Sequence, residues 1–138
     1  MARLPNQFYT IFVVTSNLKI MNELEVKLGL KKLKQEWEPK GFKCDTYTSA
    51  PGEFWSNPGH KTDEYIILIE GDLEISFQGK TYNPAIGEIL KVPARVPHIF
   101  GNPGQTSNCV YWIYAFDWQW NEDGSGTEEG RILSRIDG

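Results

Sequence analysis

The feature that most limits the fold of this chain is a series of short β-rich runs that begins after Gly41. Valine, isoleucine, threonine and aromatic residues favour strands, whereas the glycine, proline and asparagine between the runs favour turns. No alternating helices are available to support a parallel sheet, so the pattern predicts an all-β, antiparallel sandwich or barrel. The runs that we expect to form strands lie at residues 42–49, 64–70, 73–77, 88–93 and 109–120.

One amphipathic helix is predicted before this β-rich part. Asn22 followed by Glu25 fits a helix N-cap with its capping-box partner, and Pro39 and Gly41 fit the end of the helix. Its apolar face is expected to pack on the core, and that face is formed by Val26, Leu30, Leu33 and Trp37.

Residues 1–20 differ from the helix that follows. The segment Phe8–Val14 is β-branched and aromatic, which favours a strand laid on a sheet edge, of this chain or of a partner. An apolar strand without a partner tends to aggregate, so we expect a homodimer. Alternatively, Met21 is the initiator and the first twenty residues are an accessory segment.

The other end of the chain is acidic and rich in glycine. Residues 121–130 read NEDGSGTEEG, which predicts a flexible loop before a short tail. We therefore expect one domain with three parts: an N-terminal segment and helix at residues 1–40, a β-barrel at 41–120, and a flexible loop and tail at 121–138.

Composition excludes several classes of function. With 138 residues and a net charge of −4, the chain has no overall positive field to attract nucleic acid. No apolar run approaches the roughly 18 residues that a membrane-spanning helix needs. Only two cysteines are present and they have no C-x-x-C spacing, which favours neither a disulfide scaffold nor a structural zinc site. A reducing cytoplasm is the expected setting.

The two histidines of the chain, His60 and His98, each lie at the edge of a predicted strand. On an extended strand His60, Thr62 and Glu64 project from the same face, so an imidazole and a carboxylate would converge. If His98 comes from a neighbouring strand, the result is a 2-His-1-carboxylate set, which suits a divalent metal ion with open coordination positions. Such a site binds ligands or catalyses, rather than holding the fold together.

These segments resemble the two motifs of the cupin superfamily over residues 42–118. The first motif, G-x5-H-x-H-x3-E-x6-G, has Pro58 in place of its first histidine and is otherwise matched at Gly52, His60, Glu64 and Gly71. The second, G-x5-P-x-G-x2-H-x3-N, has Arg95 in place of its middle glycine and is otherwise matched at Gly87, Pro93, His98 and Asn102.

The resemblance implies a jelly-roll β-barrel with a divalent metal ion, either iron, manganese, nickel or zinc, between its sheets. Because Pro58 removes one family ligand, the metal ligands implied here are His60, Glu64 and His98. The substitution also keeps a second interpretation open: a metal-free cupin that binds a small molecule or another protein, with the two histidines lining an empty pocket.

The expected function is to bind a divalent metal ion and a small polar organic ligand, and no specific reaction can be assigned. Arg95 is a candidate to hold an anionic group of that ligand by bidentate hydrogen bonds. Trp55 and Tyr47 are candidates to line its pocket. Strand alternation alone leaves open whether Trp112 and Tyr114 or Tyr111 and Ile113 point inward.

Overall fold

Side chains that are more buried alternate with side chains that are less buried along the strands of this protein. In β3 (Glu64–Glu70) the side chains of Ile66 and Leu68 are buried, because every second residue of a strand faces the same side of its sheet. The strand has the predicted bounds. The hairpin of β4 (Glu74–Phe77) and β5 (Lys80–Tyr82) turns at Gln78 and Gly79, whose φ angles of 53° and 77° are the left-handed values that a two-residue hairpin turn requires.

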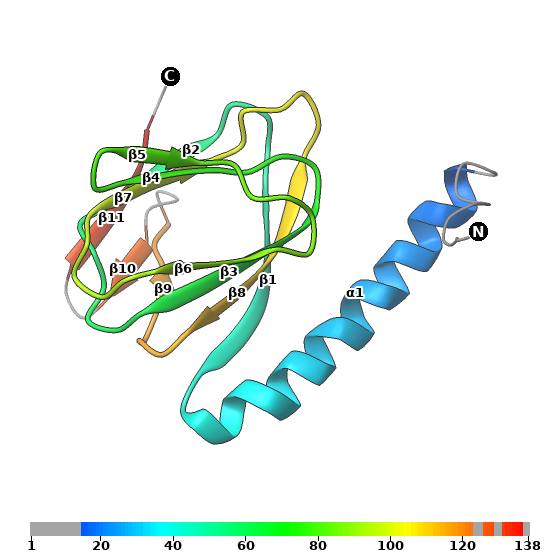
Figure 1. The fold of residues 1–138 in the computed structure, drawn as a ribbon, viewed down its shortest axis with the longest axis horizontal. Coiled ribbons are helices and arrows are strands. Elements are labelled where there is room, and N and C mark those ends of the chain that lie inside the picture. The colour runs from blue at the N-terminus through cyan, green and yellow to red at the C-terminus, as the bar shows by residue number, and fades with distance from the viewer. Residues whose placement is uncertain (1–14, 123–125, 129–130, 137–138) are drawn as a thin grey trace.

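The computed structural model describes residues 15–122, 126–128 and 131–136, and within 15–22, 126–128 and 131–136 it describes only the course of the chain. These residues form one α-helix, one 3₁₀ helix and two antiparallel sheets that face each other (Figure 1). No described helix is long and apolar enough to cross a membrane.

The smaller sheet has four strands in the order β1-β8-β3-β6, and the larger has seven in the order β5-β4-β7-β2-β11-β10-β9. The core between them is formed mainly by Ile66, Leu68, Leu73, Ile75, Phe77, Val92 and Val110. The remaining strands are β1 (Lys43–Ser49), β2 (Phe54–Asn57), β4 (Glu74–Phe77), β5 (Lys80–Tyr82), β6 (Ile89–Val92), β7 (His98–Gly101), β8 (Asn108–Tyr114), β9 (Gln119–Trp120), β10 (Gly126–Glu128) and β11 (Arg131–Ile136).

Helix α1 (Thr15–Trp37) packs on the outer face of the four-stranded sheet. The Tyr111 hydroxyl donates a hydrogen bond to the Val26 carbonyl over 2.8 Å, and the Trp37 ring contacts Tyr65. The predicted apolar face is therefore the one that meets the sheet. The helix passes into a 3₁₀ turn, η1 (Glu38–Lys40), and ends at Gly41, as predicted.

The helix begins earlier than the sequence predicted. Residues 15–21 are helical, so the prediction of an N-cap at Asn22 was wrong. Helix formers from Leu18 onward extend the helix toward the N-terminus. The strand expected at Phe8–Val14 lies outside the described residues.

The C-terminal part also differs from the prediction of a loop and a tail. Strands β10 and β11 pair with each other, and β11 continues the seven-stranded sheet by pairing with β2. Of the glycines that suggested a flexible loop, Gly126 is the first residue of β10.

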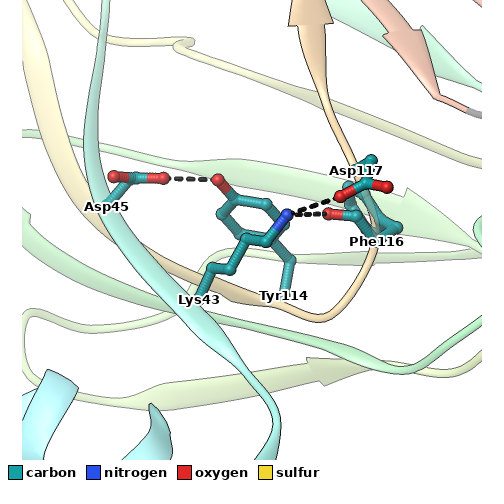
Figure 2. A network of polar contacts seen from close by, with 5 residues as sticks. All are labelled: Lys43, Asp45, Tyr114, Phe116 and Asp117. Carbon is teal, nitrogen blue, oxygen red and sulfur yellow. Dashed lines mark hydrogen bonds and ion pairs between the residues drawn. The ribbon is translucent and has the colours of Figure 1, made fainter.

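Strand β8 answers the question that alternation left open. Tyr111 and Ile113 face the helix, whereas Trp112 lies on the inner side with Tyr114 stacked against it at a ring distance of 4.0 Å. Figure 2 shows the network around Tyr114, whose hydroxyl donates a hydrogen bond to Asp45 on the neighbouring strand. Lys43 reaches across to the Asp117 carboxylate at 2.8 Å and to the Phe116 carbonyl.

We expect Tyr114→Phe to change how the stability of the protein depends on alkaline pH. Burial, then the hydrogen bond to Asp45 and its charge, raise the pKa of the Tyr114 hydroxyl. The folded state therefore holds this proton more tightly than the unfolded state, and the stabilisation is complete below an unfolded pKa of about 10 and is lost as pH rises further. Urea unfolding at pH 8 and pH 10.5 measures this loss.

In Tyr114→Phe the free energy of unfolding should be lower by about 1 kcal/mol at pH 8 and should fall less between the two pH values. Asp45→Asn is the matched control, because it keeps a hydrogen-bond acceptor and removes only the charge. An equal decline in parent and Tyr114→Phe would contradict the prediction.

Candidate metal centre and pocket

Two loops that pack back to back position the histidines. The loop between β2 and β3 carries His60, and the loop between β6 and β7 leads into His98, the first residue of β7. The Arg95 amide donates a 2.6 Å hydrogen bond to the His60 carbonyl, and the Ala94 amide donates one of 2.8 Å to the Asp63 carboxylate. These bonds fix one loop against the other.

The structure brings His60, Glu64 and His98 together, and all three are buried. The Nε2 atom of His98 lies 2.9 Å from one Glu64 carboxylate oxygen, and the Nε2 atom of His60 lies 3.5 Å from the other. One potential ligand atom from each residue lies within 4.8 Å of the other two. The predicted reason for this convergence was wrong. Residues 60–63 form a loop and not an extended strand, so strand alternation does not place His60.

The carboxyl group of Glu64 is buried, yet its neighbours favour its ionised form. Burial by itself raises the pKa of this carboxyl, but the hydrogen bond from His98, the charges of both histidines and the Trp112 indole outweigh it, so the pKa lies below its usual value. The Trp112 indole N–H donates to Glu64 over 2.7 Å. The site therefore holds a buried carboxylate that a neighbouring cation or donor must stabilise.

The hydrogen bonding of His98 fits a metal ligand. Its Nδ1 atom lies 3.0 Å from the Val96 carbonyl oxygen, which can only accept, so Nδ1 carries a proton. In the neutral ring Nε2 then has a lone pair facing the Glu64 carboxylate. A positive charge between these two atoms, either a proton or a metal ion, resolves this conflict, and backbone-anchored Nδ1 is the usual arrangement for a metal-binding histidine.

An aromatic cavity adjoins the cluster and has a volume of about 40 Å³. Because one water needs roughly 10–15 Å³, a cavity of this volume has room for a few waters or for a compact organic molecule. Tyr47 and Trp55 line it, as the sequence predicted, and so do His60 and Glu64. The other aromatic lining residues are Phe100, Trp112, Trp118 and Trp120.

Arg95 does not line this cavity, and its side chain is exposed. Its backbone contacts His60, as described above, and its φ angle is 65°. The resemblance places glycine at this position, and the left-handed backbone explains that preference. The described contacts of Arg95 are therefore those of its backbone, which holds the loop. The position of its side chain does not support a role in binding a ligand.

Sequence reasoning missed three residues that build the site. Gly59, with a φ of 99°, lets the His60 loop press against Arg95 and Val96. Trp118 and Trp120 close the cavity after the chain leaves β8. The positive φ of Gly59 has no signal in a single sequence, but two tryptophans two residues apart after a buried strand were a visible sign of an aromatic wall.

The described residues form a small β-domain of two sheets, with a buried His-Glu-His cluster that could hold a metal ion. The sequence matches the family described as "Cupin domain" over residues 46–114, which is half of the chain. This protein belongs to the cupin family.

Solved structures share the fold at low sequence identity. The cupin domain of an XRE family transcriptional regulator from Enterobacter cloacae is 18% identical, with a TM-score of 0.52 over 58% of this chain and 86% of that one. A protein from Photorhabdus luminescens is 19% identical, with a TM-score of 0.50 over 61% of this chain and 66% of that one. A cupin superfamily protein from Desulfitobacterium hafniense is 19% identical, with a TM-score of 0.49 over 55% and 68%. A comparison with curated proteins found no match.

Proposed function

We propose that this protein is a single-domain cupin of the jelly-roll barrel type that binds a divalent metal ion through His60, Glu64 and His98 and a small organic ligand in the adjoining cavity. The observation that carries the proposal is the set of three buried ligand atoms within 4.8 Å of one another. Three protein ligands leave coordination positions open, and iron(II), manganese, nickel and zinc all suit such a set.

Different residues of the chain have different roles in this proposal. His60, Glu64 and His98 hold the ion, Trp112 fixes the carboxylate by its hydrogen bond, and the aromatic walls exclude water. When bound, the ion supplies Lewis-acid or redox chemistry at its open positions. The lining is largely aromatic, so the ligand has an apolar body as well as the polar groups that the sequence suggested.

Metal analysis tests the proposal. Protein dialysed against iron(II), manganese, nickel or zinc and then freed of excess ion should retain about one ion per chain of at least one metal, measured by elemental analysis. If none is retained, the alternative function is favoured: a metal-free cupin in which the same cavity binds a small molecule.

We also propose that the protein is a homodimer in a cytoplasmic setting. Leu24 and Leu28 support association, because on helix α1 both are more than half exposed, at 59% and 60%. Among the described strands, β1 lies at an edge of its sheet, where one side of its backbone has no described strand beside it. Sedimentation velocity at micromolar concentration should give the mass of a dimer, and a monomer would contradict the proposal.

A further inference from the structure

The ring of Phe116 covers one face of the His60 imidazole. The centroids of the two rings lie 4.0 Å apart, and their planes are inclined by only 20°. Both side chains are buried, with 2% of Phe116 and 4% of His60 exposed. An imidazole that turned about its Cβ–Cγ bond would push its edge into the Phe116 ring, and a close-packed interior resists such an overlap. The stacking therefore restricts the orientation of the His60 ring.

This orientation is the one in which His60 meets the other two candidate ligands. Its Nε2 atom lies 3.5 Å from a Glu64 carboxylate oxygen, and its ring contacts the His98 ring at a centroid distance of 5.3 Å. A turn of the imidazole would carry Nε2 away from Glu64. A ligand that already has its binding orientation loses less rotational freedom when it binds, so the affinity of the site depends on this restriction.

Phe116 is itself fixed by its surroundings. It follows β8, where the chain leaves the four-stranded sheet, and its ring packs against Tyr114 and Trp112 at centroid distances of 5.0 Å and 5.6 Å. Its carbonyl oxygen accepts a hydrogen bond from the Lys43 ammonium group over 3.4 Å (Figure 2). The stack therefore connects a candidate ligand in a loop to the neighbouring strands β1 and β8.

We propose that Phe116 is a positioning residue of the metal centre, which holds the His60 imidazole with Nε2 toward Glu64 in the absence of metal. Phe116 has no ligand atom and acts only through His60. The inference rests on the proposed function, because the orientation of His60 matters for metal binding only if His60 is a ligand. Residues that orient metal ligands typically contribute 10- to 100-fold to metal affinity.

The Phe116→Leu variant is expected to bind zinc(II) about 10-fold more weakly than the parent, measured by isothermal titration calorimetry on the full chain. Leucine keeps an apolar side chain there but has no flat face. Phe116→Tyr keeps the flat ring and should bind zinc(II) like the parent. Phe42→Leu is the matched control, because Phe42 contacts Trp37 and Tyr65 and has no described contact with a candidate ligand. Circular dichroism checks that each variant is folded.

Proton magnetic resonance of the metal-free protein measures the orientation directly. The chain has only two histidines, so the carbon-bound ring protons of His60 are readily assigned with a His60→Ala variant. Protons above the face of an aromatic ring are shifted upfield by its ring current. We expect this upfield shift of the His60 signals in the parent, in Phe116→Tyr and in Phe42→Leu, and its loss in Phe116→Leu. A merely structural role of Phe116 would lower stability without moving these signals.

The outcomes separate this inference from the metal centre. If the parent binds zinc(II) and Phe116→Leu binds it equally well, the positioning role is overturned and the metal centre stands. A loss of equal size in Phe116→Tyr or Phe42→Leu, or unchanged His60 signals in Phe116→Leu, would also overturn the positioning role. A parent that binds neither zinc(II) nor iron(II), manganese or nickel would contradict the metal centre and overturn both proposals.

Discussion

The His98→Ala variant is expected to bind divalent metal at least about 100-fold more weakly than the parent, beyond the 10- to 100-fold loss typical of changes around a metal site. The reason is that removal of His98 leaves His60 and Glu64, and two protein ligands have little advantage over hydrated metal. Elemental analysis after dialysis against each metal, followed by removal of excess ion, measures the retained amount.

Two glutamate-to-glutamine variants, one in the site and one outside it, provide the matched control for this prediction. Glu64→Gln removes a negative ligand and should lose metal as His98→Ala does. Glu88→Gln changes the same functional group at an exposed turn, where Glu88 accepts a hydrogen bond from the Ala85 amide, and should retain metal like the parent. Circular dichroism of each variant checks the fold. Equal, near-zero occupancy in the parent and His98→Ala would contradict the metal site.

The Gly59→Ala variant is expected to be both less stable and poorer at holding metal. A Cβ atom at residue 59 would lie 2.8 Å from the Arg95 carbonyl carbon and 2.9 Å from the Val96 amide nitrogen. Both are backbone atoms, which cannot swing aside as a side chain can, so the two loops must separate. Left-handed strain and overpacking together predict a loss of about 2–5 kcal/mol in the free energy of unfolding.

Gly52→Ala separates these two causes. Gly52 also has a positive φ, of 78°, but a Cβ atom there meets nothing within 4 Å. This control should lose only the conformational part, about 1–2 kcal/mol, and should keep its metal. In Gly59→Ala the displaced His60 should weaken metal binding about 10- to 100-fold. Similar urea midpoints for the two variants would show that the stability of the protein does not depend on the close approach of the His60 loop to Arg95 and Val96.

The inward face of β3 could be predicted from the sequence because Glu64 marks it, and Ile66 and Leu68 lie two and four residues further along the same face. Strand β8 carries no such marker, and both of its faces are covered, one by helix α1 and the other by the cavity region. Its inward residues could therefore not be chosen without the structure.

The meeting of His60, Glu64 and His98 could be predicted from the motif spacing, whereas the path of the chain between them could not. His60 and Glu64 meet because Gly59 turns the loop against Arg95 and Val96, which local alternation cannot reveal. The aromatic wall depends on contacts between Tyr47 of β1 and Trp120 of β9, far apart in the sequence. The C-terminal strands were missed because the acidic, glycine-rich composition of residues 121–130 is typical of a loop.

The three ligand atoms come from both sheets: Glu64 begins β3 of the smaller sheet, whereas His98 begins β7 of the larger one and His60 follows β2 of the same sheet. An ion held by all three would join the two layers at one point, and pulling the layers apart would release it. Folding and metal supply would then be thermodynamically linked. At a free ion concentration one hundred times the dissociation constant, the free energy of unfolding would rise by about 2.7 kcal/mol. Removal of the metal would therefore lower the stability of the protein.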